Sequence, residues 1–446
     1  MNVRNRSLAL LLLALAAACD QARPPTSPDG EALTSLTPPP GGSTICDADN
    51  GGLTLPRGFC ALVVHDAMTP GGAPARARHI AVAPNGDVFV AIQSAGGGVL
   101  ALRDTTGDGK PDVVAQFGSG PGHGIFYRAP YLYFAPNDRV ERYQMSAASL
   151  TPVSGPEVIV SGMPASGDHV TKSIVVTADG FLYVDLGSAS DVCQVVNRQA
   201  GSPGVDPCPE LPTRAGMWRY NAGQLGQVHG TGARFATGIR NMVAMALNGQ
   251  NGELYGVQHG RDNLNVYWPS QFTPQDQAEL PAEELFRVQQ GADYGWPYCY
   301  YDGRQNLKVL APEYGGNGST VGRCSTAQAP LLAFPAHWAP NGLLFHSGTG
   351  MPAKFQGMAF VAFHGGHNRP SPFINQGFNV VSVPFAAGAP SGTARVFADG
   401  FTGGATNLPG GAAHRPVGLA EGPDGSIYVT DDVGGRIWRI MYTGQP

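Results

Sequence analysis

The chain has little charge and no blocks of like charge. Of its 446 residues 14% are charged, and the formal net charge is −5 at pH 7. Nucleic-acid-binding surfaces need clustered Lys and Arg, so this composition argues against a nucleic acid as partner. Apart from one apolar run near its start, the chain has no segment of membrane-spanning length. The seven cysteines form neither a C-x-x-C pair nor the C-x-x-C-H pattern of covalent haem, which leaves zinc ligation without a supporting spacing.

Glycine and proline are abundant instead. The chain contains 62 Gly and 38 Pro, while 42% of its residues are hydrophobic. A chain with that much apolar material can bury a core, so the composition indicates dense turns rather than disorder. We therefore expect an all-β protein.

One phrase recurs six times along the chain. A loop with Arg, His or Pro leads into a short apolar strand, a tight turn, and a second apolar strand. Repeated antiparallel units of this kind predict a six-bladed β-propeller, with one phrase in each blade. The phrases begin near Arg76, Gly122, His169, Arg240, Trp338 and Arg415, and their turns fall near Gly86, Pro130, Gly180, Gly252, Gly357 and Gly425.

The first residues are typical of a targeting segment. Arg4 and Arg6 precede the apolar run 8–18, which ends in small residues before Cys19. We expect residues 1–19 to be a lipoprotein-type signal peptide and 20–45 a flexible tether rich in Pro, Gly and Ser. Residues 46–446 are expected to form the propeller. The protein would then be periplasmic or at the cell surface, attached to a membrane only through lipid on Cys19. Plain secretion is the alternative, because Ala16 stands where lipoproteins more often have Leu.

The other six cysteines form three pairs that are local in sequence. An even number in an exported protein favours disulfides, although the sequence alone permits 15 connectivities. We favour the local pairs Cys46/Cys60, Cys193/Cys208 and Cys299/Cys324. Two of the three pairs fall in long insertions, at roughly 193–238 and 262–335. Long loops on a rigid scaffold often carry binding residues, so these insertions are candidates for the walls of a cleft.

The loops that open the phrases should converge on the propeller axis. Arg and His there would make a cationic funnel suited to a polyanionic small molecule, since guanidinium groups pair with carboxylates. The alternative is that these side chains only bond neighbouring carbonyl groups. The candidates are Arg76 or Arg78, His123, His169, Arg240 with Asn241, His337, and Arg415.

Several motifs together resemble a known family. They are Gly167-Asp-His169, Gly238-Ile-Arg240-Asn241, Gln258-His-Gly260-Arg261-Asp262, Tyr294-Gly-Trp-Pro-Tyr-Cys299 and His364-Gly-Gly-His-Asn-Arg369. In that order they look like the soluble sugar dehydrogenases that depend on pyrroloquinoline quinone (PQQ), especially the sorbosone and pyranose dehydrogenase type. The similarity covers about residues 50–441.

The resemblance implies a PQQ- and calcium-dependent oxidoreductase. Its substrate would be the hydroxyl of a sugar or sugar aldehyde, and its electron acceptor an external quinone or cytochrome. A neutral imidazole is a suitable base for the hydroxyl proton, and a fixed Arg stabilises charge that grows on a quinone oxygen. By resemblance, the catalytic residues are His169 and Arg240, the cofactor-binding residues are Arg240, Asn241, Arg415, Arg369 and Arg76, and the calcium ligands are the carbonyl groups of Gly260 and Arg261. Asp262 is either a further acidic group of this site or a turn residue.

Three smaller features have competing interpretations. The loop 104–112 resembles an acidic calcium loop, but Thr106 replaces the middle carboxylate and an exposed hairpin turn explains it as well. Phe334 or Trp338 is a candidate for stacking on a planar cofactor. Two other functions remain open: a hydrolase similar to gluconolactonases, and a non-catalytic binding propeller at the cell surface.

Overall fold

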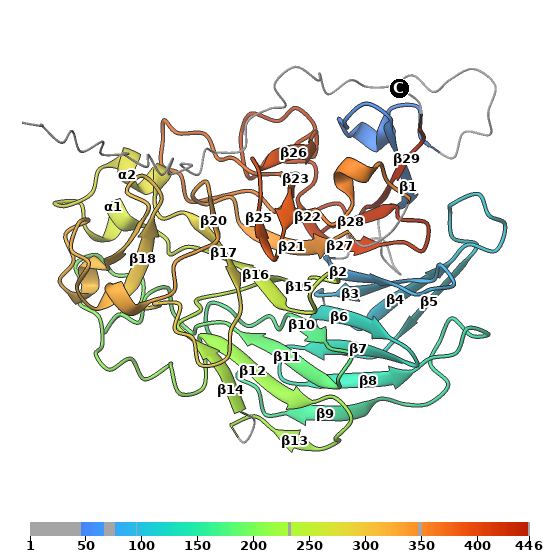
Figure 1. The fold of residues 1–446 in the computed structure, drawn as a ribbon, viewed down its shortest axis with the longest axis horizontal. Coiled ribbons are helices and arrows are strands. Elements are labelled where there is room, and N and C mark those ends of the chain that lie inside the picture. Colours follow the sequence, from blue (N-terminus) through green and yellow to red (C-terminus); the bar gives the residue numbers. More distant parts are fainter. Residues whose placement is uncertain (1–45, 67–75, 95, 231–232, 347–349, 445–446) are drawn as a thin grey trace, which may run out of the picture.

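The computed structural model describes residues 46–66, 76–94, 96–230, 233–346 and 350–444. The expected signal peptide and tether, residues 1–19 and 20–45, lie outside these ranges. Strands dominate the described residues and form six antiparallel sheets around a common axis (Figure 1). The expected six-bladed β-propeller is confirmed.

The first three blades follow the chain in order. Blade one contains β2 (Ala77–Val82), β3 (Val88–Ile92), β4 (Val99–Arg103) and β5 (Val113–Phe117). Blade two contains β6 (Gly122–Arg128), β7 (Tyr131–Pro136), β8 (Val140–Gln144) and β9 (Glu157–Ser161), with β13 (Gln227–Val228) parallel to β9. Blade three contains β10 (Ile174–Val176), β11 (Phe181–Leu186), β12 (Gly216–Asn221) and β14 (Ala233–Thr237).

The last three blades bring the chain back to its start. Blade four contains β15 (Ala244–Leu247), β16 (Leu254–Gln258), β17 (Glu283–Arg287) and β20 (Leu332–Phe334). Blade five contains β21 (Pro340–Phe345), β22 (Ala359–Phe363), β23 (Asn379–Val383) and β26 (Arg395–Ala398). Blade six contains β27 (Pro416–Glu421), β28 (Ile427–Asp431) and β29 (Ile437–Tyr442), and β1 (Phe59–His65) is its outer strand.

The innermost strands close the ring. Contacts run from β2 to β6, β10, β15, β21 and β27, and from β27 back to β2. In each blade the inner strand is paired antiparallel with the next strand, so the turns between them lie at one face of the disc. Gly86 and Gly252, with φ of 90° and 72°, take up the left-handed backbone of such turns at little steric cost. The residues before each inner strand therefore lie together at the opposite face.

The insertion in blade four adds a small layer outside the ring. It contains α1 (Leu264–Tyr267), α2 (Pro274–Glu279), β18 (Cys299–Asp302) and β19 (Leu307–Leu310), which gather at one side of the molecule in Figure 1. The short strands β24 (Phe385–Ala386) and β25 (Ala389–Pro390) form a separate hairpin in blade five. Among the described residues, no helix combines the length and apolar character that crossing a bilayer requires.

All three expected disulfides are present: Cys46–Cys60, Cys193–Cys208 and Cys299–Cys324. The first lies near the strand that closes the ring, and the other two cross-link the insertions.

The loop 104–112 is the hairpin connection between β4 and β5. Asp104 accepts backbone hydrogen bonds from Thr106, Gly107 and Gly109 at 2.7–3.0 Å. Asp112 accepts backbone hydrogen bonds from Thr105 and Thr106. The N–H groups of the loop itself satisfy both carboxylates. A hairpin turn therefore explains the loop geometry without a bound ion.

Closure of the ring depends on an aromatic cluster under β1. Phe59 is 1% exposed, and its ring centroid lies 5.1 Å from those of both Phe355 and Phe397. We predict that Phe59→Ala lowers the free energy of unfolding by about 3–5 kcal/mol, because the cavity cannot collapse in a packed core. Guanidinium unfolding measures this, with Val114→Ala on the exposed face of β5 as control. The control should change stability by less than about 0.5 kcal/mol, and equal effects of the two variants would contradict the proposed role of β1.

Candidate active site

A cavity of about 240 Å³ lies where the residues before the inner strands converge. Its walls come from blades three, four and five, together with one residue of the disulfide-closed loop 193–208. The lining residues are Asp168, His169, Arg198, Arg240, Asn241, His259, Gly260, Asp262, Glu283, His337, Ala339, Gly366, His367 and Asn368. His169, Arg240 and Asn241, expected to act together, therefore do meet at one cavity.

His169 is held in a defined orientation. Its Nδ1 lies 3.0 Å from the carbonyl oxygen of Ser188 and 2.9 Å from the Ser188 hydroxyl. That hydroxyl donates to the carbonyl oxygen of Ser190 at 2.6 Å, so both Ser188 oxygens can accept a proton from Nδ1. This pattern assigns the proton to Nδ1 and leaves the lone pair on Nε2. Burial, together with the charge of Arg240, holds the pKa of His169 well below its usual value, so the ring is neutral near pH 7.

Arg240 forms a buried ion pair beneath the cavity. Its Nη2 lies 2.7 Å from Oδ1 of Asp191, and its Nε lies 3.1 Å from the same oxygen. Asp191 is fully buried, and Arg240 is 4% exposed. Burial alone would lower the pKa of Arg240, but the carboxylates of Asp191 and Asp262 outweigh it and raise that pKa. In the described part of the chain Nη1 of Arg240 donates no hydrogen bond, so it is available to a ligand in the cavity.

Asp262 links two walls of the cavity. Its Oδ2 accepts from Arg240 at 3.1 Å and from Arg198 at 3.2 Å, while its Oδ1 accepts from the amide of Asn368 at 2.8 Å. Burial favours the protonated form of Asp262, but Arg240, His337 and Arg198 together hold its pKa well below the usual range. Asp262 is thus an ionised member of the site rather than only a turn residue.

The backbone after β16 also faces this region. Gly260 lines the cavity and donates its N–H to Glu283 at 2.7 Å. The side chain of Arg261 is buried and pairs with the buried Glu313, with Nη2 and Oε1 2.9 Å apart. Among described residues, no hydrogen bond ends on the carbonyl oxygen of Gly260 or Arg261. Burial raises the pKa of Glu283 to about 7, although two backbone N–H groups favour its ionised form.

The other three expected cofactor residues do not line this cavity. Arg415 donates from Nε to the carbonyl oxygen of His364 at 2.9 Å and from Nη2 to that of Gly365 at 2.5 Å, so it holds the loop after β22. Arg369 donates to Gln376 at 3.0 Å on that same loop. Arg76 is exposed at the start of β2. The hydrogen bonds of Arg415 thus match the alternative interpretation, in which these side chains bond neighbouring carbonyl groups.

The expected cationic funnel needs correction. Within the cavity Arg198 and Arg240 are both paired with carboxylates, and three imidazoles are engaged through one ring nitrogen. His337 donates from Nε2 to the carbonyl oxygen of Gln277 at 2.7 Å, and His259 to that of Pro340 at 2.9 Å. The site is therefore polar and nearly charge-balanced. The carboxylates responsible come from strand ends and insertions, which the phrase openings do not include.

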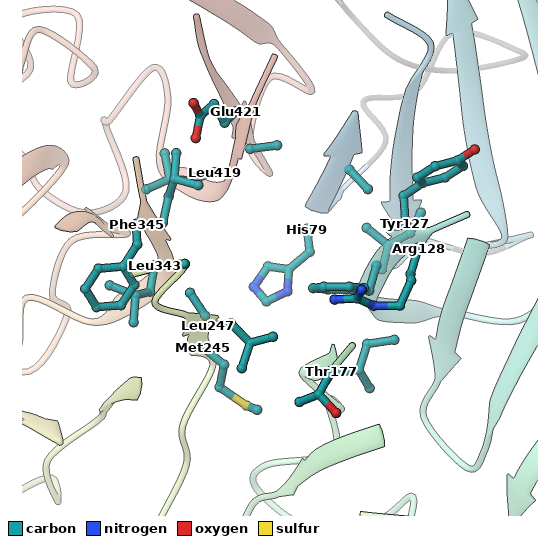
Figure 2. A pocket seen from close by; sticks show the side chains of 18 of the residues that line it. His79, Tyr127, Arg128, Thr177, Met245, Leu247, Leu343, Phe345, Leu419 and Glu421 are labelled. Carbon is teal, nitrogen blue, oxygen red and sulfur yellow. The ribbon is translucent and has the colours of Figure 1, made fainter. Parts of the chain in front are cut away.

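Arg78 and His123 occupy the axis instead of the cavity. Arg78 donates from Nε to Nδ1 of His123 at 2.8 Å and also pairs with Asp432. The Nε2 atoms of His123 and His79 are 3.0 Å apart. His79 in turn lines a larger cavity of about 720 Å³ at the turn side of the disc, where Figure 2 shows its ring among Leu343, Met245 and Thr177. Arg78 and His123 are buried, whereas His79 is half-buried and faces the larger cavity.

The two candidate stacking residues lie in the core. Phe334 is 2% exposed, and its ring centroid lies 5.0 Å from that of Phe363. Trp338 packs against the same Phe363 at 5.3 Å. Neither lines the cavity, because both point between blades four and five. In this structure neither side chain is placed to stack on a group bound in this cavity.

Sequence reasoning missed Ser188, Asp191 and Glu283. Ser188 and Asp191 follow β11, the second strand of blade three, and Glu283 begins β17, the third strand of blade four. A search limited to the openings of the phrases does not reach them. The signal that could have found two of them is the polar run Ser188-Ala-Ser-Asp191 directly after an apolar strand.

Comparisons with known proteins agree with this architecture. A family model described as TrAA12-like matches residues 55–443. A structure of the family AA12 carbohydrate-active enzyme of Trichoderma reesei has a TM-score of 0.70 at 20% identity, covering 88% of this chain and 98% of that one. The PQQ domain of pyranose dehydrogenase from Coprinopsis cinerea gives the same TM-score and identity, covering 87% and 97%. The soluble aldose sugar dehydrogenase of Escherichia coli gives 0.56 at 17% identity, covering 86% and 99%.

One relative matches the chain in sequence over about half of its length. An uncharacterized protein of Borreliella burgdorferi is 26% identical over 211 residues, which is 46% of this chain and 48% of that protein. The chain thus spans about half the length of the curated relative it matches.

The match to the family model covers most of the chain, so the protein belongs to the TrAA12-like family. The resemblance to the pyranose dehydrogenase type is confirmed.

The half-buried imidazoles of His79 and His259 predict a loss of stability in acid. Burial lowers the pKa of His79 to about 4 and that of His259 to about 3, against about 6.5 in an unfolded chain. Between these values the unfolded state binds more protons than the folded state, so stability falls as the pH drops from about 6.5 to about 4. Guanidinium unfolding at several pH values measures this. His79→Gln should flatten the dependence, and parallel curves for His79→Gln and the unaltered protein would contradict the assignment.

Proposed function

We propose that the protein is a PQQ- and calcium-dependent oxidoreductase that oxidises a hydroxyl of a sugar or sugar aldehyde. One observation carries this proposal: the neutral imidazole of His169, with its lone pair on Nε2, shares a cavity with Arg240, whose Nη1 donates no hydrogen bond to a described residue. Membership of the TrAA12-like family supports the same reaction class. A base and a cationic donor at one cavity are what hydride abstraction from an alcohol requires.

The polar groups of the cavity suit PQQ, which carries carboxylates and quinone oxygens. Nη1 of Arg240 can donate to an oxygen atom of the cofactor, and this donor is fixed by the ion pair with Asp191. Oδ1 of Asn241 is buried and accepts no hydrogen bond within the described chain, and as an acceptor it can pair only with an N–H or O–H group of a ligand or water. Buried polar atoms without partners are rare and indicate an absent ligand or water. A holo structure of the related Coprinopsis cinerea domain supports PQQ as the ligand.

Calcium fits the backbone beside Arg240. We assign the carbonyl oxygens of Gly260 and Arg261 as its ligands, because no described group donates to them. Oxygen ligands, including backbone carbonyls, are those that Ca²⁺ prefers. A Trichoderma reesei structure described as a calcium structure supports this ion in a relative. Arg415, Arg369 and Arg76 would act at the edge of the site, where Arg415 shapes the loop after β22.

The chain's own residues then have separate tasks. PQQ, when bound, supplies the quinone that accepts hydride from the substrate carbon. His169 accepts the hydroxyl proton at Nε2, and Ser188 keeps its Nδ1 proton in place. Arg240 offers a fixed positive charge close to the reacting oxygens, and Asp191 prevents the guanidinium from turning away.

The remaining assignments concern the surroundings of the enzyme. The insertions 193–238 and 262–335 would select the substrate, because Arg198 and Asp262 already line the cavity. The electrons would pass to an external quinone or cytochrome. We place the protein in the periplasm or at the cell surface, anchored by lipid on Cys19, on the evidence of the apolar run and small residues before this cysteine.

Reconstitution tests the proposed reaction. The purified protein is incubated with PQQ and calcium, and dye reduction is followed on a panel of aldoses and sugar aldehydes. We predict calcium-dependent turnover that falls about 100- to 10,000-fold in His169→Asn, because a general base contributes about that factor. In Arg240→Lys the rate should fall about 100- to 1,000-fold, because Lys lacks the two fixed nitrogens that both donate to Oδ1 of Asp191.

The matched control is His65→Asn, which makes the same substitution in β1 of the closing blade. Its turnover should equal that of the unaltered protein. Absorbance titration of PQQ into each variant separates loss of binding from loss of chemistry. Full activity in His169→Asn would remove the proposed base, and absence of turnover on every sugar with PQQ bound would favour a non-catalytic binding protein.

A further inference from the structure

The short loop after β11, residues 188–191, carries the partners of both proposed catalytic side chains. Ser188 accepts the Nδ1 proton of His169, and Asp191 pairs with Arg240. Ser188 also donates its backbone N–H to the carbonyl oxygen of Arg240 at 2.8 Å. Any displacement of this loop would therefore move the base and the guanidinium together.

The loop is held from outside by one carboxylate. Glu210 accepts the backbone N–H of Ala189 at 2.5 Å through Oε2, and its Oε1 accepts the hydroxyl proton of Ser190. The Ser190 hydroxyl in turn accepts the backbone N–H of Cys193 at 2.9 Å. Hydrogen bonds to an ionised acceptor are stronger than neutral ones, so this carboxylate fixes the loop more firmly than an amide would.

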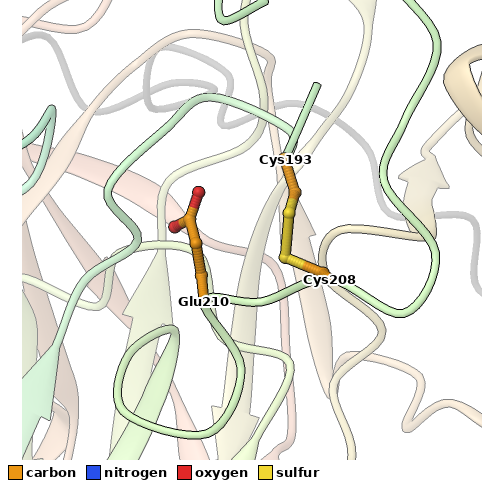
Figure 3. Close-up of side chains that lie close together, drawn as sticks. All are labelled: Cys193, Cys208 and Glu210. Atoms are coloured by element: carbon orange, nitrogen blue, oxygen red, sulfur yellow. A yellow bond between two sulfur atoms is a disulfide. The ribbon is translucent and has the colours of Figure 1, made fainter. Parts of the chain in front are cut away.

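A disulfide brings Glu210 to this position. Glu210 is 21 residues from Ala189 in sequence, and the Cys193–Cys208 bond closes the intervening chain two residues before it. Figure 3 shows the Glu210 side chain beside this disulfide. With the disulfide formed, Cys193 at the end of the loop and Glu210 belong to one cross-linked unit.

We propose that Glu210, fixed by the Cys193–Cys208 disulfide, is a positioning residue that sets the tautomer of His169 and the orientation of Arg240 through the loop 188–191. It touches neither the cavity nor the two side chains, so it acts only through Ser188 and Asp191. The inference rests on the proposed function for its kinetic consequence. Its structural consequence, the tautomer of His169, can be measured without cofactor or substrate.

The first test uses Glu210→Gln in the cofactor-free full-length protein. Nitrogen-15 NMR of labelled histidines reports the protonated ring nitrogen and the pKa of His169. The unaltered protein should show only the Nδ1–H form, with a pKa well below its usual value. In Glu210→Gln we expect a mixture of both tautomers and a pKa that moves up toward about 6.5, because the ring loses its fixed acceptor and gains water.

The second readout is kinetic, with PQQ and calcium added. We expect kcat to fall about 100-fold, as for a small displacement of a reacting group, and the KM for the sugar to change less than kcat. The acid limb of the pH profile should move to higher pH along with the pKa of His169. Glu253→Gln is the matched control, because Glu253 lies on the turn face and pairs with the exposed Arg287. It should leave tautomer, kcat and pH profile unchanged.

Two further variants keep the test decisive if Glu210→Gln folds poorly. Ser190→Ala removes one of the groups that Glu210 accepts from, and Cys193→Ser with Cys208→Ser removes the cross-link. Both should shift the His169 tautomer in the same direction. A single Nδ1–H form in all folded variants would overturn the inference, whether or not the protein oxidises sugars. A shifted tautomer without turnover in the unaltered protein would support the inference and refute the proposed function.

Discussion

The site depends on the buried ion pair between Arg240 and Asp191. Both side chains are removed from water, which costs several kcal/mol for each ion and is offset only when geometry and further hydrogen bonds are good. Asp191 meets that condition through one oxygen: its Oδ1 also accepts the backbone N–H of Asp262, and its carbonyl oxygen accepts the indole N–H of Trp296 at 2.8 Å, while its buried Oδ2 accepts no hydrogen bond from a described residue. The pair therefore ties blade three, blade four and the Trp296 loop to one point. Losing the charge of Arg240 would leave Asp191 buried without an ion-pair partner among the described residues, whereas losing that of Asp191 would leave Arg240 paired with Asp262 alone.

This constraint explains why the cavity holds neutral imidazoles around paired charges. With the arginines neutralised by Asp191, Asp262 and Asp168, nearby histidines are neutral because burial and the neighbouring Arg240 both disfavour their charged form. The rings of His169, His259 and His337 are each held by carbonyl or hydroxyl acceptors at one nitrogen, and no described residue bonds the other nitrogen. The propeller supplies the rigid frame, while the disulfide-closed insertions supply the groups that fix these orientations.

The sequence predicted the β-propeller that carries the site better than the side-chain contacts inside the site. Gly86 and Gly252 marked the turns correctly, because a tight turn needs a residue that tolerates positive φ. The cysteine pairs were correct because all three are local in sequence. Asp191 and Ser188 were missed, since their convergence on Arg240 and His169 depends on loop conformation, which has no periodic pattern. Trp338 was expected as a stacking residue but packs against Phe363 in the core, since spacing alone does not tell which side of a blade a loop residue faces.

A crystal structure of the protein soaked with PQQ and calcium tests the central claim most directly, namely that the cavity at the openings of the inner strands is the cofactor site. The account predicts electron density for the cofactor within hydrogen-bonding distance of Nη1 of Arg240 and beside Nε2 of His169. It also predicts an ion at the carbonyl oxygens of Gly260 and Arg261. Cofactor density in the larger cavity around His79, with the cavity at Arg240 unchanged, would contradict it.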